Sequence, residues 1–290
     1  MSPVSPYGPS RRRSQSSPRA GHATRRNLLL GAGGLAVVGA GATLAPRPGP
    51  PVDLNRFTLA FEDDFRSLDV TPHGPGSKWI AHTPWNGDFG DAQFVDPQPG
   101  FPFTATPDGL TITARKGADG RWQGGLLASV DANGNGFSQQ YGYFEMRAKL
   151  PDAPGVWPAF WLDSFVPKGS TDASIEIDGL EYYGQFPGAY QATVHIWPQD
   201  HTTPSQVRET ISVRPHSLGD AFHAYGVSVD KNWIIIYLDR QEKWRAPTPP
   251  EHKHKLMILL DLTLGGGWPI DATPSPCVMQ VDYVRAYAWK

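Results

Sequence analysis

The chain has 290 residues and a formal net charge of −2, and glycine and proline together (31 and 29 residues) make up about a fifth of it. Only 19% of the residues are charged and 11% are aromatic, which excludes a helical bundle, a coiled coil and a chain that is disordered throughout. The first 52 residues carry seven arginines and no acidic residue. The remainder therefore holds 19 basic against 28 acidic residues and is a poor candidate for binding nucleic acid.

Residues 1–45 have the pattern of an export signal. The pair Arg25-Arg26 precedes a short, glycine-diluted apolar run that ends in small residues, and this resembles a bacterial twin-arginine signal. We expect cleavage near Ala42 and a body that is periplasmic or secreted, with an uncleaved N-terminal anchor as the alternative. The apolar run is a weak membrane anchor, so no stable membrane insertion of the mature domain is expected. A proline-rich linker over 46–54 then leads to one domain over 55–290.

Alternation of apolar and polar residues recurs along this domain and predicts strands. The predicted strands, in chain order, are 110–114, 141–150, 222–229, 233–238, 256–264 and 279–289. The segment 256–264 is nearly all apolar, as expected of a central strand buried on both faces. No segment has a sustained helical period, so we predict an all-β sandwich of two antiparallel sheets. The lone cysteine, Cys277, excludes an intrachain disulfide and a cysteine-based zinc site.

The strand 141–150 has two different faces. Phe144 and its alternate neighbours are apolar, whereas the other face carries Tyr143, Glu145 and Arg147. Aromatic rings stack on the apolar faces of sugars and charged groups bind hydroxyls, so this face, with Trp157 and Trp161 nearby, suits a sugar chain. An ordinary solvated face is the alternative.

The segment 173–184 concentrates acidic residues. Glu176 and Asp178 share one face of a strand, and strict alternation would put Glu181 on the opposite face. Gly179 can absorb one extra residue as a β-bulge, which would return Glu181 to the acidic face. The two glutamate Cα atoms would then lie roughly 13 Å apart. Side chains leaning together would leave a gap of roughly 5 Å, the spacing of a retaining glycoside hydrolase.

The same segment has no cation between Lys168 and Arg208 in the sequence. Converging carboxylates without a basic partner repel one another, and one is held protonated near neutral pH, which supplies an acid and a base. The titration belongs to the cluster and not to a single residue. The alternatives are a solvated acidic strand or a calcium site, although calcium prefers ligands from flexible loops.

The sequence Glu-Ile-Asp-Gly-Leu-Glu at 176–181 resembles the signature of glycoside hydrolase family 16 in the bulged form of laminarinase-like members. The surrounding segments 141–151, 155–162, 222–227, 264–269 and 281–287 also resemble family segments, so the resemblance covers roughly 57–289. It implies a β-jelly-roll sandwich with a concave substrate cleft. It also implies an endo-acting, retaining β-glycan hydrolase, with β-1,3 or mixed β-1,3-1,4-glucan, or a bacterial exopolysaccharide, as substrate.

The resemblance also implies roles for individual residues. Glu176 would be the nucleophile, Asp178 would position it, and Glu181 would be the general acid and base. His195 would lie beside Glu181, and Trp268 would cap one end of the cleft, with a packed loop anchor as its alternative. The remaining sugar-binding residues would be Asn86, Glu145, Arg147, Trp157 and Trp161.

No cofactor is expected for the chemistry itself. Many family members bind one structural calcium, and the matching positions here are Glu62, the Gly109 carbonyl and Asp282. We expect a monomer whose partner is its polysaccharide. A transglycosylase on the same scaffold stays open, because nothing local separates transfer to a sugar from transfer to water. A non-catalytic glucan-binding protein is disfavoured because this chain keeps all three acidic residues.

Overall fold

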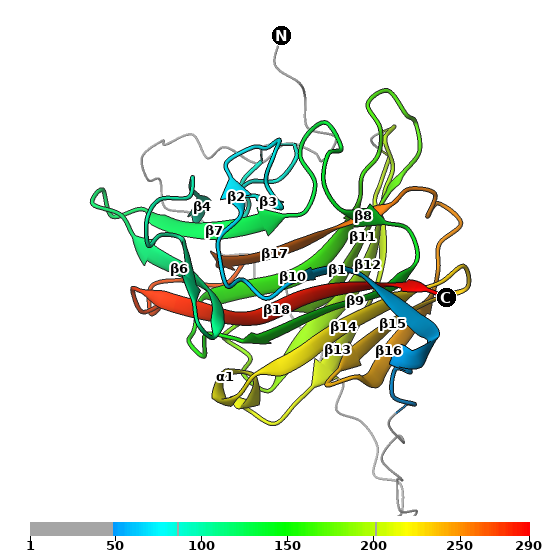
Figure 1. The fold of residues 1–290 in the computed structure, drawn as a ribbon. Helices are drawn as coiled ribbons and strands as arrows, with labels where there is room; N and C mark the ends of the chain where they lie inside the picture. Colours follow the sequence, from blue (N-terminus) through cyan, green and yellow to red (C-terminus); the bar gives the residue numbers. More distant parts are fainter. Residues whose placement is uncertain (1–48, 86, 201) are drawn as a thin grey trace, which may run out of the picture. The chain divides into compact units, whose positions relative to one another are not determined.

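The computed structural model describes residues 49–85, 87–200 and 202–290. Its described residues form eighteen strands, one 3-10 helix (η1, Leu54–Arg56) and one short α-helix (α1, Ser217–Asp220), so the all-β prediction is confirmed. Most strands belong to two antiparallel sheets, and Figure 1 shows how they follow one another along the chain. None of the described helices has the length and apolar character that a membrane crossing needs.

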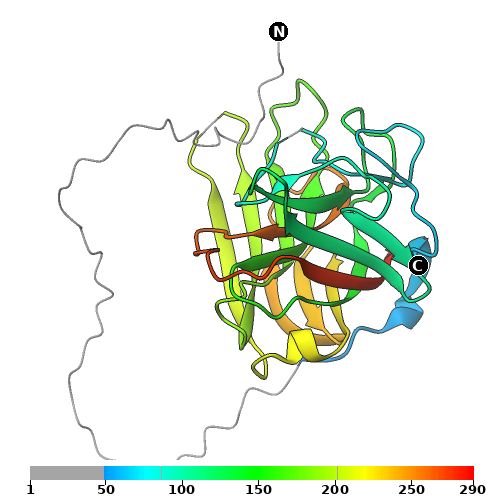
Figure 2. The same cartoon turned by 90° about the vertical axis from the view of Figure 1, so that its left-hand side faces the viewer.

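Sheet A has the neighbour order β16-β15-β14-β9-β18, and β18 pairs on its other edge with β6 along its first part and with β1 along its second. Figure 2 shows β18 in red beside β6 in teal. The strands of sheet A are β1 (Phe57–Asp63), β5 (Phe103–Thr106), β6 (Gly109–Lys116), β9 (Gly142–Lys149), β14 (His223–Val229), β15 (Trp233–Leu238), β16 (Gln241–Pro247) and β18 (Cys277–Trp289).

Sheet B has the order β13-β12-β11-β10-β17-β7-β3-β2. Two short strands join it: β8 pairs with β17, and β4 pairs in parallel with β7. The strands of sheet B and its additions are β2 (Val70–Thr71), β3 (Trp79–Ile80), β4 (Gln93–Phe94), β7 (Trp122–Ala128), β8 (Ser138–Gln139), β10 (Val156–Ser164), β11 (Ser174–Glu181), β12 (Ala189–Trp197), β13 (Ser205–Ser212) and β17 (Leu256–Leu264).

The main core joins apolar side chains from both sheets. Phe144 and Met146 of β9 and Ile175 and Ile177 of β11 are fully buried in one hydrophobic cluster. This confirms the inward face that alternation predicts for both strands. All nine residues of β17 are buried, as expected of a strand covered on both faces. Since Ile175 and Ile177 point into the core, Glu176 and Asp178, which alternate with them, point to the opposite face of sheet B.

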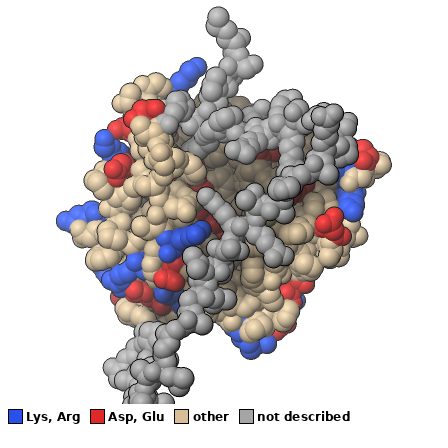
Figure 3. All heavy atoms as spheres, turned by 180° about the vertical axis from the view of Figure 1, so that it is seen from behind, with Lys and Arg blue, Asp and Glu red and all other residues tan. Residues whose placement is uncertain are grey.

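That opposite face of sheet B, which we call the acidic face, is covered in part by the segment between β3 and β7. A second hydrophobic cluster joins β3, β4, β7, β10 and β17 there, and Trp85 and Phe89 of the connecting loop pack against it. In Figure 1 the cyan and teal segment with β2, β3 and β4 lies next to β7. Figure 3 shows acidic and basic side chains interspersed on the visible surface of the molecule seen from behind.

Candidate active site

The strand β11 contains the bulge that the sequence predicts. Asp178 pairs with Thr193 of β12 and Glu181 pairs with Gln191, so β11 advances by three residues while β12 advances by two. The extra residue falls at Gly179-Leu180. A Cβ atom on Gly179 would lie 2.5 Å from Val227 Cγ2, so the close approach of β14 beneath the bulge requires glycine. The bulge brings Glu181 to the acidic face together with Glu176 and Asp178.

Glu176 is held from the neighbouring strand β12. The indole N–H of Trp197 donates a 2.6 Å hydrogen bond to Glu176 Oε2, and His195 is the cross-strand partner of Glu176. The side chain keeps part of its surface exposed. A short hydrogen bond from an N–H group and a nearby imidazole both favour the ionised form of this carboxyl group, which suits a nucleophile.

Asp178 lies deeper than the two glutamates and is 4% exposed. Its Oδ2 atom is 3.1 Å from His195 Nε2. One carboxylate oxygen of Glu176, one of Asp178 and one ring nitrogen of His195 all lie within 4.8 Å of one another. The direct contact of His195 is thus with Asp178, while its charge also acts on Glu181, so its predicted place beside Glu181 stays a prediction. In the register of β11 with β12, His195 is opposite Glu176, and the bulge places Glu181 opposite Gln191.

Glu181 has two hydroxyl neighbours that sequence reasoning missed. Tyr183 donates a 3.0 Å hydrogen bond to Glu181 Oε1, and the Thr193 hydroxyl is 3.5 Å from Oε2. Glu181 is itself partly exposed. The available sequence signal for Tyr183 was its position two residues after Glu181, on the same face. A partly exposed carboxyl with donors on both oxygens can keep a fixed orientation while it gives or takes a proton.

All three carboxyl groups have raised pKa values, and burial is the largest cause for each. For Glu176 the charge of Asp178 raises the pKa further, and for Asp178 the charge of Glu181 does so. For Glu181 the hydrogen bond from Tyr183 and the charge of His195 offset part of the rise. The raised pKa values agree in direction with what is expected of an acidic cluster that has no lysine or arginine partner, where ionisation of one carboxyl group opposes ionisation of the others.

Two further buried acids on the same face were missed in the sequence. Asp163 of β10 is the cross-strand partner of Glu176 and accepts a 2.6 Å hydrogen bond from Ser174. Asp261 of β17 is fully buried, and its pKa is raised well above the ordinary value, chiefly by burial. A single aspartate inside an otherwise apolar strand was the available signal for both. Their charges raise the pKa values within the acidic cluster: Asp163 acts on Glu176, and both act on Asp178.

The two tryptophans of β10 differ in accessibility. Trp157 is partly exposed and stacks on Tyr183, with ring centroids 5.6 Å apart and an interplanar angle of 17°. Trp161 is 5% exposed, donates its N–H to Asp261 Oδ1 at 2.9 Å and lies against Trp85. Trp157 can therefore meet a sugar ring, whereas the prediction that Trp161 lines a subsite is contradicted by its burial.

The loop after β17 reaches the acidic face through three glycines. Gly265, Gly266 and Gly267 all have positive φ, and a Cβ atom on Gly266 would lie within 3 Å of both the Tyr183 and Trp157 rings. Trp268 follows with 43% of its surface exposed and makes an edge-on contact with Phe186 at 4.8 Å. The predicted position of Trp268 at one end of the site stays a prediction.

Glu145 and Arg147 lie elsewhere, so their predicted contacts with sugar are wrong. Both belong to β9 of sheet A, and Glu145 is fully buried. It accepts hydrogen bonds from Arg240 (two, each 2.9 Å), Tyr143 (2.6 Å) and Tyr283 (2.9 Å). Alternation identified the residues that share a face, but it could not show that this face turns away from the acidic face of sheet B.

The predicted calcium ligands are not arranged as a cation site. Asp282 forms an ion pair with Arg147, and Glu62 forms one with Arg285 at 2.9 Å. Gly109 does approach the Asp282 backbone closely. Because guanidinium groups hold both carboxylates, the residues present do not fit a calcium ion, and we derive no role for one.

Two other expectations concern the edges of the site. Asn86 lies outside the described residues. Asp172, which has no basic partner nearby in the sequence, binds Lys253 at 2.7 Å and His254 at 3.0 Å in the structure. These partners come from a distant loop, so the lack of a basic residue nearby in the sequence does not leave Asp172 unpaired. The absence of a paired lysine or arginine holds for Glu176, Asp178 and Glu181 among the described ion pairs.

The strand β11 thus has the pattern Glu-x-Asp-x-x-Glu with a bulge that brings its three acidic residues to one face. The comparison with protein families agrees with this pattern. The sequence profile of "Glycosyl hydrolases family 16" matches residues 100–269, more than half of the chain. The chain belongs to glycosyl hydrolase family 16. The matched range contains the acidic face with its bulge, the β10 tryptophans and the glycine loop after β17.

Two curated proteins of Rhizobium meliloti (strain 1021) are similar to this chain. The chain is 33% identical over 260 residues to its endo-1,3-1,4-beta-glycanase EglC, and 30% identical over 260 residues to its endo-1,3-1,4-beta-glycanase ExsH. Each match covers 82% of this chain and 53% of the relative. The chain thus spans about half the length of these curated relatives.

Among solved structures, the chain is similar to SCLam, a non-specific endo-beta-1,3(4)-glucanase of family GH16. The TM-score is 0.64 and the identity 25%, and the match covers 84% of this chain and 96% of SCLam. The two-sheet fold described above is thus a family 16 fold.

Proposed function

We propose that the chain is an endo-acting glycoside hydrolase that cleaves internal β-glycosidic bonds of a β-1,3- or mixed β-1,3-1,4-glucan with retention of configuration. The observation that carries the proposal is the bulge at Gly179-Leu180, which puts Glu181 on the same face as Glu176. A retaining glycoside hydrolase uses two carboxyl groups on one face, one ionised as the nucleophile and one protonated as the acid. The activities named for the Rhizobium meliloti relatives and for SCLam support the substrate class.

In the proposed mechanism, Glu176 attacks the anomeric carbon. Its Oε2 atom is held by the Trp197 N–H, which leaves the other oxygen free of that bond for attack. Glu181 donates its proton to the leaving oxygen and then removes a proton from water, so that water releases the glycosyl group from Glu176. The partial exposure of both glutamates gives substrate access to them.

Asp178 would act through Glu176 and not on the sugar. It is buried beneath the two glutamates, and a hydrogen bond with Glu176 lowers the pKa of Asp178 against the larger effect of burial. When Glu176 becomes esterified, the loss of its charge removes one source of repulsion in the cluster. Asp178 can then carry charge itself and support Glu181 as a base.

The substrate class is tested by incubating the purified protein with laminarin, mixed-linkage glucan, agarose, carrageenan and a bacterial exopolysaccharide, with sizing of the products over time. We expect a rapid fall in chain length on one of the two glucans, since an endo-acting enzyme cuts internally. Release of monosaccharide from chain ends without that fall would contradict endo action. Products longer than the substrate chains would favour the transglycosylase. Binding without cleavage would favour the glucan-binding alternative.

The stereochemistry is tested by proton NMR of the first products. A retaining reaction releases the β-anomer initially, and mutarotation follows more slowly. Initial release of the α-anomer would contradict the proposed covalent route.

Export through the predicted twin-arginine signal is part of the same proposal. The residues concerned lie outside those that the structure describes. Expression of the full chain in a bacterium with and without a working twin-arginine pathway tests it: the activity should move from the culture fluid or periplasm to the cytoplasm when the pathway is lost. Unchanged export would contradict this route.

A further inference from the structure

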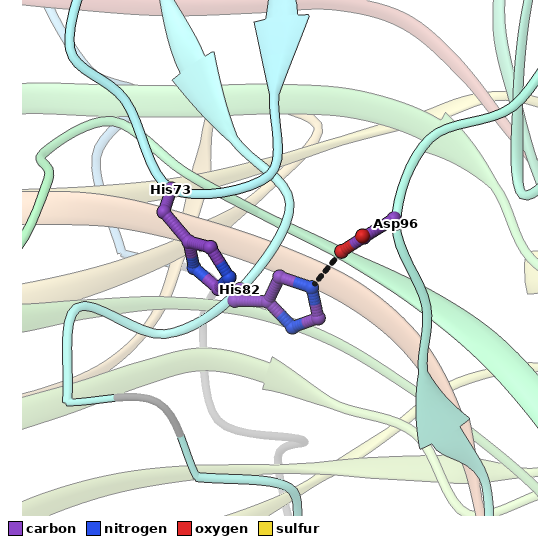
Figure 4. Close-up of side chains that lie close together, drawn as sticks. All are labelled: His73, His82 and Asp96. Atoms are coloured by element: carbon purple, nitrogen blue, oxygen red, sulfur yellow. Dashed lines mark hydrogen bonds and ion pairs between the residues drawn. The ribbon is translucent and has the colours of Figure 1, made fainter.

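A second cluster of potential ligands lies outside the acidic face. It consists of His73, His82 and Asp96, which come from three separate segments (Figure 4). One donor atom from each residue lies within 4.8 Å of the other two. His82 Nε2 is 2.9 Å from Asp96 Oδ1, and the two imidazole rings stack with centroids 4.7 Å apart. Neither the catalytic proposal nor the family resemblance gives these three residues a task.

The backbone around the two histidines is fixed. His73 lies in the loop between β2 and β3, where the Gly74 N–H donates to the Thr71 hydroxyl at 2.9 Å. The Ala81 N–H donates to the Thr71 carbonyl at 2.9 Å, which ties the segment before His82 to the segment before His73. The two rings are therefore brought together by main-chain hydrogen bonds.

The third residue is anchored in the same way. Asp96 follows β4, and the N–H of the preceding Val95 donates to the Gly124 carbonyl of β7 at 3.3 Å. The Asp96 side chain is 62% exposed and that of His82 is 12% exposed, while His73 is exposed. The ring of His82 is mostly buried, whereas the side chains of His73 and Asp96 are exposed. With their backbones held in place, the two exposed side chains can still rotate toward an ion.

Two imidazoles and one carboxylate form a donor set for a borderline transition-metal ion. Imidazole nitrogen and carboxylate oxygen bind Zn²⁺ at about 2.0–2.2 Å, so ligand atoms in a tetrahedral site lie roughly 3.4 Å apart. Because the ligand atoms already lie within 4.8 Å of one another, any pair needs to close by at most about 1.4 Å to reach this spacing, which is within the reach of side-chain rotation. Calcium is disfavoured because it takes six to eight oxygen ligands.

We propose that His73, His82 and Asp96 bind a divalent transition-metal ion such as Zn²⁺, with water completing the coordination. The ion would fasten the β2–β3 loop to the segment after β4. His82 is three residues before Trp85, whose ring centroid is 6.2 Å from that of Trp161. Metal binding at this site thus stabilises the segment that covers part of the acidic face, without touching the catalytic carboxylates.

The proposal is tested with the untagged full chain after treatment with a chelator. Titration with Zn²⁺ in a calorimeter should give one ion per chain, and Co²⁺ should give visible d–d absorption typical of four- or five-coordinate nitrogen and oxygen ligands. Zn²⁺ should also raise the unfolding temperature, since an ion that binds only the folded state stabilises it. His82→Ala and Asp96→Asn should each weaken Zn²⁺ binding at least tenfold and remove that rise.

His254→Ala is the matched control. His254 also pairs with an aspartate, at 3.0 Å from Asp172, and its side chain is 18% exposed, but it has no place in the His73 cluster. Binding should be unchanged in this variant. His195→Ala tests the other grouping of possible ligands, Glu176, Asp178 and His195.

Three results would overturn the proposal. These are the absence of stoichiometric Zn²⁺ binding, unchanged binding in both His82→Ala and Asp96→Asn, or loss of binding in His195→Ala alone. The first would leave His82 and Asp96 as a simple ion pair. Asp96→Asn replaces only the carboxylate of a largely exposed side chain by an amide and should leave the fold intact, so a folding defect in His82→Ala would not prevent the decision.

Discussion

Two regions of the molecule bury carboxyl groups, and they do so in opposite ways. On sheet A, Glu145 is fully buried but receives two hydrogen bonds from Arg240 and one each from Tyr143 and Tyr283. On sheet B, the pair Glu176 and Glu181 shares a face with buried Asp178 and has no arginine or lysine in its described ion pairs. The first region has enough donors to satisfy its charge, whereas the second has too few.

The pKa directions express this difference. Burial raises the pKa of Glu145, but the bonds from Arg240 and the tyrosines outweigh it and leave the value below the ordinary one. In the acidic cluster burial and mutual repulsion win, and the pKa values are raised. A buried carboxylate with a full set of donors stabilises a fold, while carboxyl groups short of donors retain a proton that can be used in chemistry.

The largest expected effect separates the two regions by activity. Glu176→Ala and Glu181→Ala should each lower kcat/KM on the best glucan by roughly 10³-fold or more, because they remove the proposed nucleophile and the proposed acid. Their circular dichroism spectra and unfolding temperatures should stay at or above those of the unmodified protein, since a repelling charge is lost. Glu209→Ala, an exposed glutamate of β13, is the control and should keep full activity. If either variant kept half of the activity of the unmodified protein, the roles assigned to Glu176 and Glu181 would be refuted.

The second test expects the opposite pattern, a loss of stability with little change in activity. Glu145→Ala should lower the free energy of unfolding by about 2–4 kcal/mol, because it leaves Arg240 and two tyrosine hydroxyls without their acceptor. This figure lies below the usual range for fully buried pairs because the Arg240 side chain is 40% exposed. Below the unfolding transition, kcat should change less than twofold. Urea unfolding measures the stability and initial rates measure kcat. A large fall in kcat with unchanged stability would contradict the structural role given to Glu145.

A third test uses pH. Glu145 has a folded pKa below its ordinary 4.5, so its contribution to stability is full well above that value and is lost as pH falls through the folded pKa. Glu181 has a raised folded pKa, so the protein loses stability as pH rises from 4.5 through that value. At pH 7, Glu145→Gln should be less stable than the unmodified protein and Glu181→Gln more stable.

The Glu181 difference should shrink as the pH falls toward 4.5, and the Glu145 difference should shrink as the pH falls further, through the folded pKa of Glu145. Unfolding temperatures measured from pH 3.5 to 7.5 follow this convergence. The same sign for both variants at pH 7 would show that the two regions do not differ in the way described.

The smallest expected effect lies at the rim of the acidic face. Trp268→Ala should raise KM roughly two- to fivefold and leave kcat unchanged, because a half-exposed ring can stack on a sugar remote from the cleaved bond. Trp233→Ala, an exposed tryptophan at the start of β15 in sheet A, is the control. Equal kinetic constants for both variants would leave Trp268 as a loop anchor.

Sequence reasoning succeeded where the relevant contacts are local. The strand faces of β9 and β11 and the bulge at Gly179 follow from alternation and from one glycine within eight residues. Reasoning of this kind failed for Glu145, because its main partner Arg240 is 95 positions away and only the folded sheet brings them together. The calcium prediction failed for the same reason, since Arg147 is distant from Asp282 in sequence.

The catalytic surroundings were partly predictable as well. The glutamates and Asp178 could be identified from one segment, but the partners of each depend on the register between β11 and β12. The bulge shifts that register by one residue beyond Asp178 and puts Glu181 opposite Gln191, while His195 stays opposite Glu176 and contacts Asp178. Asp163 and Asp261 were visible as isolated acids in apolar strands, yet their approach to the cluster depends on pairing across β10.

The most direct measurement traps the intermediate of the proposed reaction. The protein is incubated with a 2-deoxy-2-fluoro glucosyl oligosaccharide bearing a good leaving group, and the peptides are then sequenced by mass spectrometry. The account predicts one glycosyl group per chain, attached to Glu176, and no label in Glu176→Ala. A label on Glu181 or Asp178, or turnover with no trapped ester at all, would contradict the claim that the bulge brings together a nucleophile and its acid on one face.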